Sequence, residues 1–374
     1  MWISALGLQN FRSYEAAHFR FEPGTTTFLA PNGTGKTNIV EAVGYISSVR
    51  SHRSASDEPL VRSGCDSGVI STVAHRGQRH VTVDITIKAK GANRARINRS
   101  PVRIRDVLGL IPSVVFSPED LALVRGEPAG RRDFIDSLLI AMWPRYAGVL
   151  ADVDKALKQR NALLKAIRTH NDSATLDIWN YAFAQAAAEV IIGRYKLLEL
   201  LSEPLSEAFQ FISSHATHAR QKVTTNYVSR LPYKECKTPA EVIDVLMEGM
   251  AARASAEIER GSTLLGPQRD DIALSIGSLS AKHYASHGEG WSLALALRLA
   301  AFEVLHASES AADAPILILD DVFAELDKGR RHRLAERITT AEQVFITAAD
   351  AADLPDNLPG KTLQVDGQTG NHGV

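Results

Sequence analysis

The 374-residue sequence has few cysteines, no long apolar run and almost no net charge. Cys65 and Cys236 lie far apart without a neighbouring Cys or His at metal-ligand spacing, so neither a disulfide framework nor a structural zinc site is expected. No leader-like start and no window of 18 uninterrupted apolar residues is found, so we expect a soluble, cytoplasmic protein. A net charge of -1 gives no overall attraction to nucleic acid or anionic membranes, so any such partner requires a local patch.

The chain is long enough and, at 45% hydrophobic, apolar enough to bury one large domain or two associated domains. Its periodicity predicts strands at 2–8 and 25–30, then a Gly-rich turn and a helix over 36–47. Two further alternating segments, 69–74 and 81–87, predict antiparallel strands with one solvent-facing surface. The N-terminal part is therefore predicted to be α/β with an appended antiparallel β meander.

Helical periodicity dominates from residue 131 to residue 260. Apolar stripes over 150–167 and 198–212 predict two helices, with a turn at 170–173 between them. The sequence Thr-Pro-Ala-Glu at 238–241 predicts the start of a third helix, because Thr and Glu can bond free backbone N–H groups and Pro tolerates the first helical position.

Strand-like apolar runs return at 314–320 and 343–348. The expected organisation is therefore a head made of residues 1–130 and 261–374, with a helical lobe, or short arm, inserted at 131–260.

The strongest local motif is a P-loop between a predicted strand and a predicted helix, formed by Ala30, Pro31, Asn32, Gly33, Thr34, Gly35, Lys36 and Thr37. The two glycines let successive backbone N–H groups converge on phosphate oxygens, and the helix that follows adds its positive end. Lys36 is predicted to reach the β and γ phosphates of ATP, and Thr37 to ligate Mg²⁺. Ala30 departs from the pattern, which usually begins with glycine. An ordinary glycine turn is the alternative, and the strand-to-helix context disfavours it.

A second motif consists of four apolar residues followed by Asp320 and Asp321. Ligands bind at the carboxyl ends of strands in α/β sheets, so Asp320 is a candidate Walker B ligand of Mg²⁺ and Asp321 a candidate for polarising the attacking water. By itself, such a pair is more often a solvated strand end. The P-loop earlier in the chain favours the catalytic interpretation.

A Ser/Gly turn with Ser286 and Gly288 precedes an Ala- and Leu-rich helix. Small residues before a helix N-terminus can form an anion site, and Ser286 could donate to a γ-phosphate. Although such a turn is also a common helix cap, its position before the Asp320 strand matches an ABC signature motif.

Positive charge is concentrated in residues 50–105, which contain twelve Lys or Arg and four Asp or Glu. No carboxylate occurs in the part from 85 to 105, whose seven cations are Lys88, Lys90, Arg94, Arg96, Arg99, Arg103 and Arg105. This pattern predicts contact with DNA phosphates, through a loop or hairpin tip because Gly and Asn interrupt it. A solvated strand face is the alternative. Few aromatics are interleaved, which favours duplex backbone contact over base stacking.

Five blocks in order resemble the RecF family of ABC/SMC-type ATPases: LQNFRSY at 8–14, FSPEDL at 116–121, GEP with RRDFID at 126–136, GPQRDD at 266–271 and LDDVFAELD at 319–327. They span almost the whole chain. Departures from the family pattern are Ala30, Gln268 where His is frequent, and Glu-Gly-Trp at 289–291 where Gln-Gln-Arg is frequent.

The resemblance implies an ABC-type head with a helical lobe that dimerises around two ATP molecules and binds duplex and gapped DNA. RecF-like proteins act with RecR and RecO to direct RecA onto gapped DNA. Arg12 resembles a basic residue that reaches ATP phosphate in related heads. Residues 347–350 show no counterpart of the switch histidine of ABC proteins, which implies slow hydrolysis.

Other P-loop proteins fit less well. An ABC transporter subunit has its Walker motifs much closer together, and a structural SMC protein needs hundreds of heptad residues. An ATP-dependent nuclease of the overgrowth-lysogenisation type would carry a further metal-binding domain after Asp320. A kinase would not require the signature-like turn. We therefore expect a DNA-repair ATPase, with an SMC-like chromosome-maintenance ATPase as the alternative.

Overall fold

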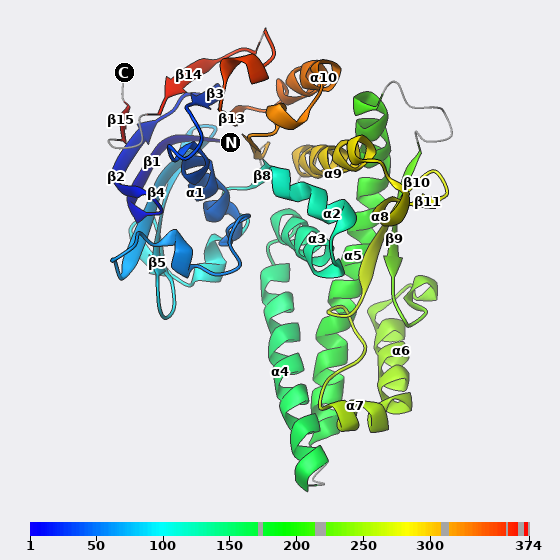
Figure 1. Cartoon of the computed structure of the whole chain (residues 1–374). Coiled ribbons are helices and arrows are strands. Elements are labelled where there is room, and N and C mark those ends of the chain that lie inside the picture. The colour runs from blue at the N-terminus through cyan, green and yellow to red at the C-terminus, as the bar shows by residue number, and fades with distance from the viewer. Residues whose placement is uncertain (171–174, 214–221, 308–313, 357, 366–369, 373–374) are drawn as a thin grey trace.

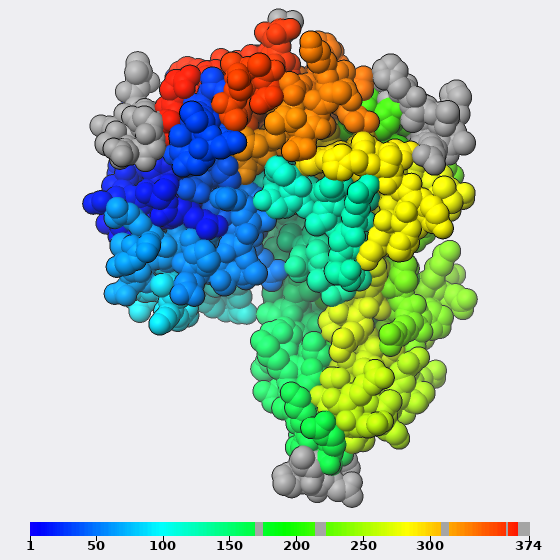
Figure 2. Space-filling model, in the orientation of Figure 1, coloured from blue at the N-terminus to red at the C-terminus, as the bar shows by residue number. Residues whose placement is uncertain are grey.

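The computed structural model describes residues 1–374 except 171–174, 214–221, 308–313, 357, 366–369 and 373–374. The chain forms two lobes with a cleft between them (Figures 1 and 2). One lobe has two β-sheets around a helix, and the other is mostly helical.

The outer sheet of the first lobe has the strand order β15-β2-β1-β4-β5-β6-β7. Its strands are β1 (Trp2–Phe11), β2 (Tyr14–Arg20), β4 (Ser67–Arg76), β5 (Arg79–Lys88), β6 (Arg94–Ile97), β7 (Ser100–Val102) and β15 (Gly370–His372). All neighbours are antiparallel except β15, which is parallel to β2. Side chains of β4 alternate between buried and partly exposed, which confirms the predicted meander with one solvent-facing surface.

The inner sheet is parallel, with the order β14-β3-β13-β12-β8. It packs against the P-loop helix α1 (Lys36–Ser48). Its strands are β3 (Gly24–Leu29), β8 (Ser113–Phe116), β12 (Ile316–Asp320), β13 (Gln343–Ala348) and β14 (Lys361–Gln364). Alternate residues of β12 face two cores: Ile316 and Ile318 join the core around α1, and Leu317 and Leu319 join the core of the helical lobe. A central parallel strand is buried on both faces, which explains its unbroken apolar sequence.

The helical lobe is organised around α5 (Leu176–Ile212), which packs against α3, α4, α6 and α9. The other helices are α2 (Leu121–Arg125), α3 (Pro128–Met142), α4 (Tyr146–His170), α6 (Pro239–Ala252), α7 (Ala254–Arg260), α8 (Ala281–Tyr284), α9 (His287–Ala307) and α10 (Lys328–Ile338). The predicted capped start of α6 is confirmed, because the Thr238 hydroxyl accepts from the backbone of Glu241 and the Glu241 carboxylate accepts from that of Thr238. The predicted turn after α4 falls mainly outside the described residues.

A small antiparallel sheet also lies in this lobe, with β10 (Asp271–Ile276) between β9 (Val223–Val228) and β11 (Leu279–Ser280). The segment 131–260, expected to form a helical lobe, also contains the strand β9, which its periodicity did not predict. This strand exists because it pairs along its whole length with β10, as Tyr227 opposite Ile272 shows, and β10 lies too far along the chain for local periodicity to reveal the pairing.

Helix α9 is long and apolar enough to cross a membrane by length and composition alone, but 78% of its apolar window is buried inside the protein. It packs against α5, α2 and β8 in the core of the helical lobe. Among the described residues it is the one helix that meets this test, and its burial accounts for its composition.

Candidate nucleotide-binding site

The P-loop runs between β3 and α1 with backbone angles that its glycines permit. Gly33 and Gly35 have positive φ values of 84° and 100°. A Cβ on Gly35 would also lie 3.0 Å from the hydroxyl oxygens of Ser13 and Tyr14, so glycine is required there both for its backbone angle and for space. Ala30 is buried and is not among the residues with positive φ, so its methyl group fits without backbone strain.

Lys36 begins α1 and is buried, with 3% of its side chain exposed. Its ammonium donates to the side-chain oxygen of Asn32 at 2.9 Å and lies 3.6 Å from an oxygen of Asp321. A buried ammonium needs anionic or hydrogen-bonding partners, and a phosphate can supply both. The fold therefore brings the P-loop lysine to the second predicted motif, while Thr37 follows in the first turn of α1.

Asp320 ends β12 beside β13, and Asp321 follows directly after the strand. Asp320 is buried, and its Oδ1 accepts from the hydroxyl of Thr347 at 2.7 Å. The Thr347 hydroxyl oxygen in turn accepts from the Asp321 backbone at 2.8 Å. Burial raises the pKa of the Asp321 carboxyl; the charge of Lys36 opposes this effect and that of Asp320 adds to it.

Arg12 lies near the P-loop but contacts a carboxylate that sequence reasoning missed. Its guanidinium donates to both oxygens of the buried Glu41, at 2.8 and 2.6 Å, and to the backbone oxygen of Pro59 at 3.0 Å. Glu41 lies in the middle of α1, where a helical pattern alone does not distinguish a buried carboxylate. In this structure Arg12 therefore connects the turn after β1 to the P-loop helix.

The signature-like turn lies on the other side of the protein from the P-loop. Ser286 follows α8, which Figure 1 places at the right of the helical lobe, whereas α1 lies in the lobe at the left. The Ser286 hydroxyl accepts from the Glu289 backbone at 3.2 Å, and the Glu289 carboxylate accepts from the Ser286 backbone at 2.8 Å. A hydroxyl that accepts can still donate its proton, so Ser286 can act both as helix cap and as phosphate ligand.

Gly288, the second predicted signature residue, is packed against a cation. A Cβ placed on Gly288 would lie 3.3 Å from the guanidinium nitrogens of Arg330 in α10. The N-terminus of α9 therefore lies beside the guanidinium of Arg330, which also pairs with Asp327 at 3.4 Å, and a nearby cation at a helix N-terminus favours an anion.

The predicted basic segment forms the hairpin of β6 and β7. Its turn residues, Asn98 and Arg99, have φ values of 50° and 69°, as the tightest hairpin turns require. Arg94 and Arg96 are exposed and flank the buried Ala95, so they share one face of the strand. The expectation of a hairpin tip is confirmed.

Two carboxylates reduce the positive charge of this hairpin. Asp84 on β5 lies directly opposite Arg96, and Asp106, one residue beyond the carboxylate-free run, pairs with Arg103 at 3.1 Å. That pairing lowers the pKa of Asp106. Of the seven candidate cations, Arg103 already has a carboxylate partner, because the following turn brings Asp106 back onto it. The other three candidate cations flank the hairpin in sequence: Lys88 and Lys90 precede β6, and Arg105 follows β7.

The family model described as "RecF/RecN/SMC N terminal domain" matches residues 2–359. Curated proteins named "DNA replication and repair protein RecF" from Renibacterium salmoninarum and Streptomyces avermitilis are 44% and 45% identical to this chain, and each alignment covers 98% of both sequences. The chain belongs to the RecF family. A solved structure described as "the recombination mediator protein RecF-ATP in RecFOR pathway" is 25% identical over 98% of this chain and 96% of that one, with a TM-score of 0.89. An SMC head bound to the C-winged helix domain of ScpA is 16% identical over 98% of this chain and 96% of its own, with a TM-score of 0.54, which shows a shared fold alone.

Two of the five sequence blocks that resemble the RecF family, 126–136 and 266–271, meet in the helical lobe. Arg131 on α3 pairs with Asp271 at the start of β10, at 2.8 Å. The guanidinium of Arg194 on α5 donates to the Asp136 carboxylate at 2.8 Å and to the backbone oxygen of Pro267 at 2.7 Å. These blocks therefore hold the lobe together, while the P-loop and the strand-end carboxylates form the candidate nucleotide site.

The departures from the RecF-family pattern at 289–291 also have structural consequences. Glu289 caps the signature turn, and a Cβ on Gly290 would lie 3.1 Å from Leu121, so α2 packs closely there. Trp291 is buried in α9. Gln268 donates to the backbone oxygen of Leu265 at 2.8 Å and so closes its own loop.

Proposed function

We propose that this protein is an ATP-dependent DNA-binding protein of recombinational gap repair and replication restart, and that ATP acts as a dimerisation switch and is hydrolysed slowly. One observation carries the proposal: the P-loop with Asp320 and Asp321 lies beside α1 in one lobe, and the turn between α8 and α9 that carries Ser286 lies in the other lobe, away from α1. The signature turn can therefore complete a nucleotide site only on a second copy of the chain. Membership of the RecF family supports this function.

In the proposed site, backbone N–H groups of residues 32–37 hold the phosphates and Lys36 neutralises their charge. Asp321 accepts a proton from the attacking water, and the raised pKa of its carboxyl brings that group closer to the range that proton transfer needs. Ser286 and Gly288 of the other subunit close the site over the γ-phosphate. Arg12 supports α1 through Glu41.

The oxygen donors present suit Mg²⁺. The Thr37 hydroxyl and the Asp320 carboxylate are hard ligands, and within the described residues no group of three or more His, Cys, Asp and Glu forms a metal cage. Mg²⁺ is usually held by one or two protein oxygens together with nucleotide phosphates and water, so the small donor set fits. When bound, Mg²⁺ would neutralise charge that develops on the phosphates.

The dimer is tested by replacing Ser286 with arginine. A bulky cation at the start of α9 should block the seam between two copies, so ATP should no longer shift the protein from monomer to dimer, whereas the wild type should dimerise with ATP but not with ADP. Sedimentation velocity with each nucleotide measures this.

The matched control is Ser278→Arg, which places the same side chain at an exposed serine of the β10–β11 turn. It should dimerise like the wild type. If Ser286→Arg forms the ATP-dependent dimer as readily as this control, the signature turn does not lie at the seam.

We propose that DNA duplex phosphates bind along the β6–β7 hairpin, at Arg94, Arg96 and Arg99, with Lys88, Lys90 and Arg105 around it. The exposed face of β6 and the turn carry these arginines, and no helix presents them, which favours phosphate contact over reading of base edges. Because phosphate contacts carry no direct information on base sequence, the protein should bind duplexes of different sequence with similar affinity. Arg103 contributes less, because Asp106 already occupies its guanidinium.

Replacing Arg94, Arg96 and Arg99 together with alanine should weaken binding to unrelated duplexes by similar factors. Each phosphate contact contributes about −0.9 to the slope of log K against log salt, so three lost contacts should flatten that slope by roughly 2 to 3. Fluorescence anisotropy titrations at several salt concentrations measure both quantities.

Arg103→Ala is the control on the same segment and should leave the slope nearly unchanged. ATP binding should stay normal in both variants. An unaltered slope in the triple variant would mean that these arginines are a solvated face and that DNA binds elsewhere.

The pathway is proposed from the relatives. The curated relatives described above are named for DNA replication and repair, and the solved RecF-ATP structure is described as that of a mediator protein in the RecFOR pathway. We therefore propose single-strand/duplex junctions as the DNA, RecR and RecO as partners, and RecA loading as the outcome. We propose that a head of residues 1–130 and 261–374, which includes part of the helical lobe, carries ATP and DNA, and that the rest of that lobe, 131–260, acts as a short arm. Its helices α4 and α5, of 25 and 37 residues, are too short for the long coiled coils of a structural SMC protein.

A further inference from the structure

A histidine that the sequence motifs do not include reaches the Walker B carboxylate. Nε2 of His52 lies 3.4 Å from Oδ2 of Asp320, and 14% of the His52 side chain is exposed. The other oxygen of Asp320 accepts from Thr347 at 2.7 Å. The two oxygens of this carboxylate thus have separate partners, one from β13 and one from the segment that follows α1.

A hydrogen-bonded turn fixes the position of His52. Helix α1 ends at Ser48, and the next residue, Val49, reverses the chain with a φ of 51°. The hydroxyl oxygen of Ser51 then accepts from the backbones of Arg53 and Ser54, both at 3.0 Å, and its proton is donated to the buried Glu41. His52 lies inside this turn, so its imidazole is held at the site and does not extend from a loose loop.

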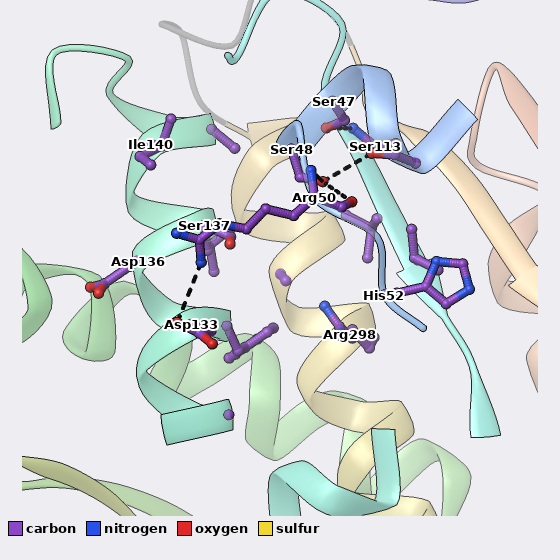
Figure 3. A pocket seen from close by; sticks show the side chains of 18 of the residues that line it. Ser47, Ser48, Arg50, His52, Ser113, Asp133, Asp136, Ser137, Ile140 and Arg298 are labelled. Atoms are coloured by element: carbon purple, nitrogen blue, oxygen red, sulfur yellow. Dashed lines mark hydrogen bonds and ion pairs between the residues drawn. The ribbon is translucent and has the colours of Figure 1, made fainter. Parts of the chain in front are cut away.

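The same segment lines the cleft between the lobes. Figure 3 shows His52 on one wall, beside the strand that carries Ser113, and Arg50 reaching towards Asp133 on α3. The Arg50–Asp133 ion pair measures 3.4 Å, and both side chains are largely exposed. Because such a pair contributes little to stability, it does not account for the ordered turn at His52. The turn at His52 is held by the hydrogen bond from Ser51 to Glu41 and by the contact of His52 with Asp320.

We propose that His52 is a positioning residue for the nucleotide site: it donates from Nε2 to Asp320 and turns that carboxylate towards MgATP. This inference rests on the proposed function. Groups that hydrogen-bond to a metal-ligating carboxylate fix its orientation, and their loss typically lowers metal affinity or activity by about 10- to 100-fold. Thr347 donates to only one oxygen of Asp320. Without His52 the second oxygen would lose its partner, and the carboxylate would be free to change its orientation.

The experiment separates binding of Mg²⁺ from binding of ATP. Purified full-length His52→Ala is titrated with Mg²⁺ at a fixed concentration of a fluorescent ATP analogue, and separately with the analogue alone in EDTA. We expect the Mg²⁺ concentration for half-maximal binding to rise about 10- to 100-fold and the metal-free affinity to stay within twofold of wild type. His52→Gln, whose amide can donate from a similar position, should recover most of the Mg²⁺ dependence.

His18→Ala is the control, because His18 is exposed on β2 in the outer sheet. It should match the wild type in both titrations. Equal Mg²⁺ dependence in His52→Ala and wild type would overturn the proposal. So would an equal loss of affinity with and without Mg²⁺, since His52 would then merely support the P-loop.

Failure of this inference differs from failure of the proposed function. If Lys36→Ala abolishes ATP binding while His52→Ala behaves as wild type, only the role of His52 is wrong. If Lys36→Ala also binds ATP normally, the nucleotide site itself is misassigned.

Discussion

Replacing Lys36 with alanine is expected to weaken MgATP binding by about 10- to 100-fold, because a hydrogen bond to a charged group contributes roughly 1.5–3 kcal/mol. Lys36 is buried, and besides Asn32 the carboxylate of Asp321 lies beside its ammonium. Bound phosphate would meet that ammonium in a site with little water, where its charge is weakly screened. Alanine removes the charge and leaves Asp321 to repel the nucleotide.

Isothermal titration calorimetry with MgATP measures the loss directly. Asp321→Asn is the informative contrast: it should bind ATP at least as well as wild type and lose turnover, because it removes the proton acceptor and retains Lys36. Lys90→Ala, which alters an exposed lysine after β5, should bind ATP normally. Wild-type affinity in Lys36→Ala would show that the loop at 30–37 is not the phosphate site.

Much of the nucleotide site was predictable because its chemistry is local in sequence. The P-loop needs glycines at fixed spacing between a strand and a helix, and the structure places positive φ at Gly33 and Gly35. The apolar run before Asp320 predicts a buried strand, and alternate residues of β12 do enter two different cores. The approach of Lys36 to Asp321 then follows from the order of the parallel strands.

The rest of the site depends on contacts between distant parts of the chain. His52 reaches Asp320 across 268 positions, and nothing in its local sequence distinguishes it from a solvated histidine. The contact between Arg12 and Glu41 was equally hidden in the sequence, because the role of a carboxylate in an apolar helix is clear only when its partner is known. Strand β9 was missed for the same reason, since its partner β10 begins more than forty residues later.

A buried ion pair in the helical lobe is another such contact. Arg160 on α4 and Glu257 on α7 are almost completely buried, 97 positions apart, and hydrogen-bonded to each other. Arg160 also donates to Asn180 on α5 and to the Thr263 hydroxyl, both at 2.7 Å, and Glu257 accepts from the Leu264 backbone at 2.7 Å. One guanidinium thus joins three helices of the helical lobe and the loop that leads to β10.

Replacing Arg160 with alanine is expected to lower the free energy of unfolding by about 3–5 kcal/mol, because it leaves the carboxylate of Glu257 buried without its cation. Chemical denaturation followed by circular dichroism measures the change. The matched control is Lys158→Ala on the same helix: Lys158 pairs with Asp154 at 2.6 Å, but both side chains are exposed, so about 0.5 kcal/mol or less should be lost.

The double replacement Arg160→Met with Glu257→Leu separates the cost of an unpaired charge from the loss of the contact itself. Apolar side chains of similar volume remove both charges together, and buried pairs replaced in this way are often neutral or stabilising. Here Asn180 and Thr263 still lose a donor, so the double variant should recover most, but not all, of the stability lost in Arg160→Ala. If Arg160→Ala unfolds no more easily than Lys158→Ala, the pair does not hold the lobe together. If the double variant is as unstable as Arg160→Ala, its hydrogen bonds matter more than its charge.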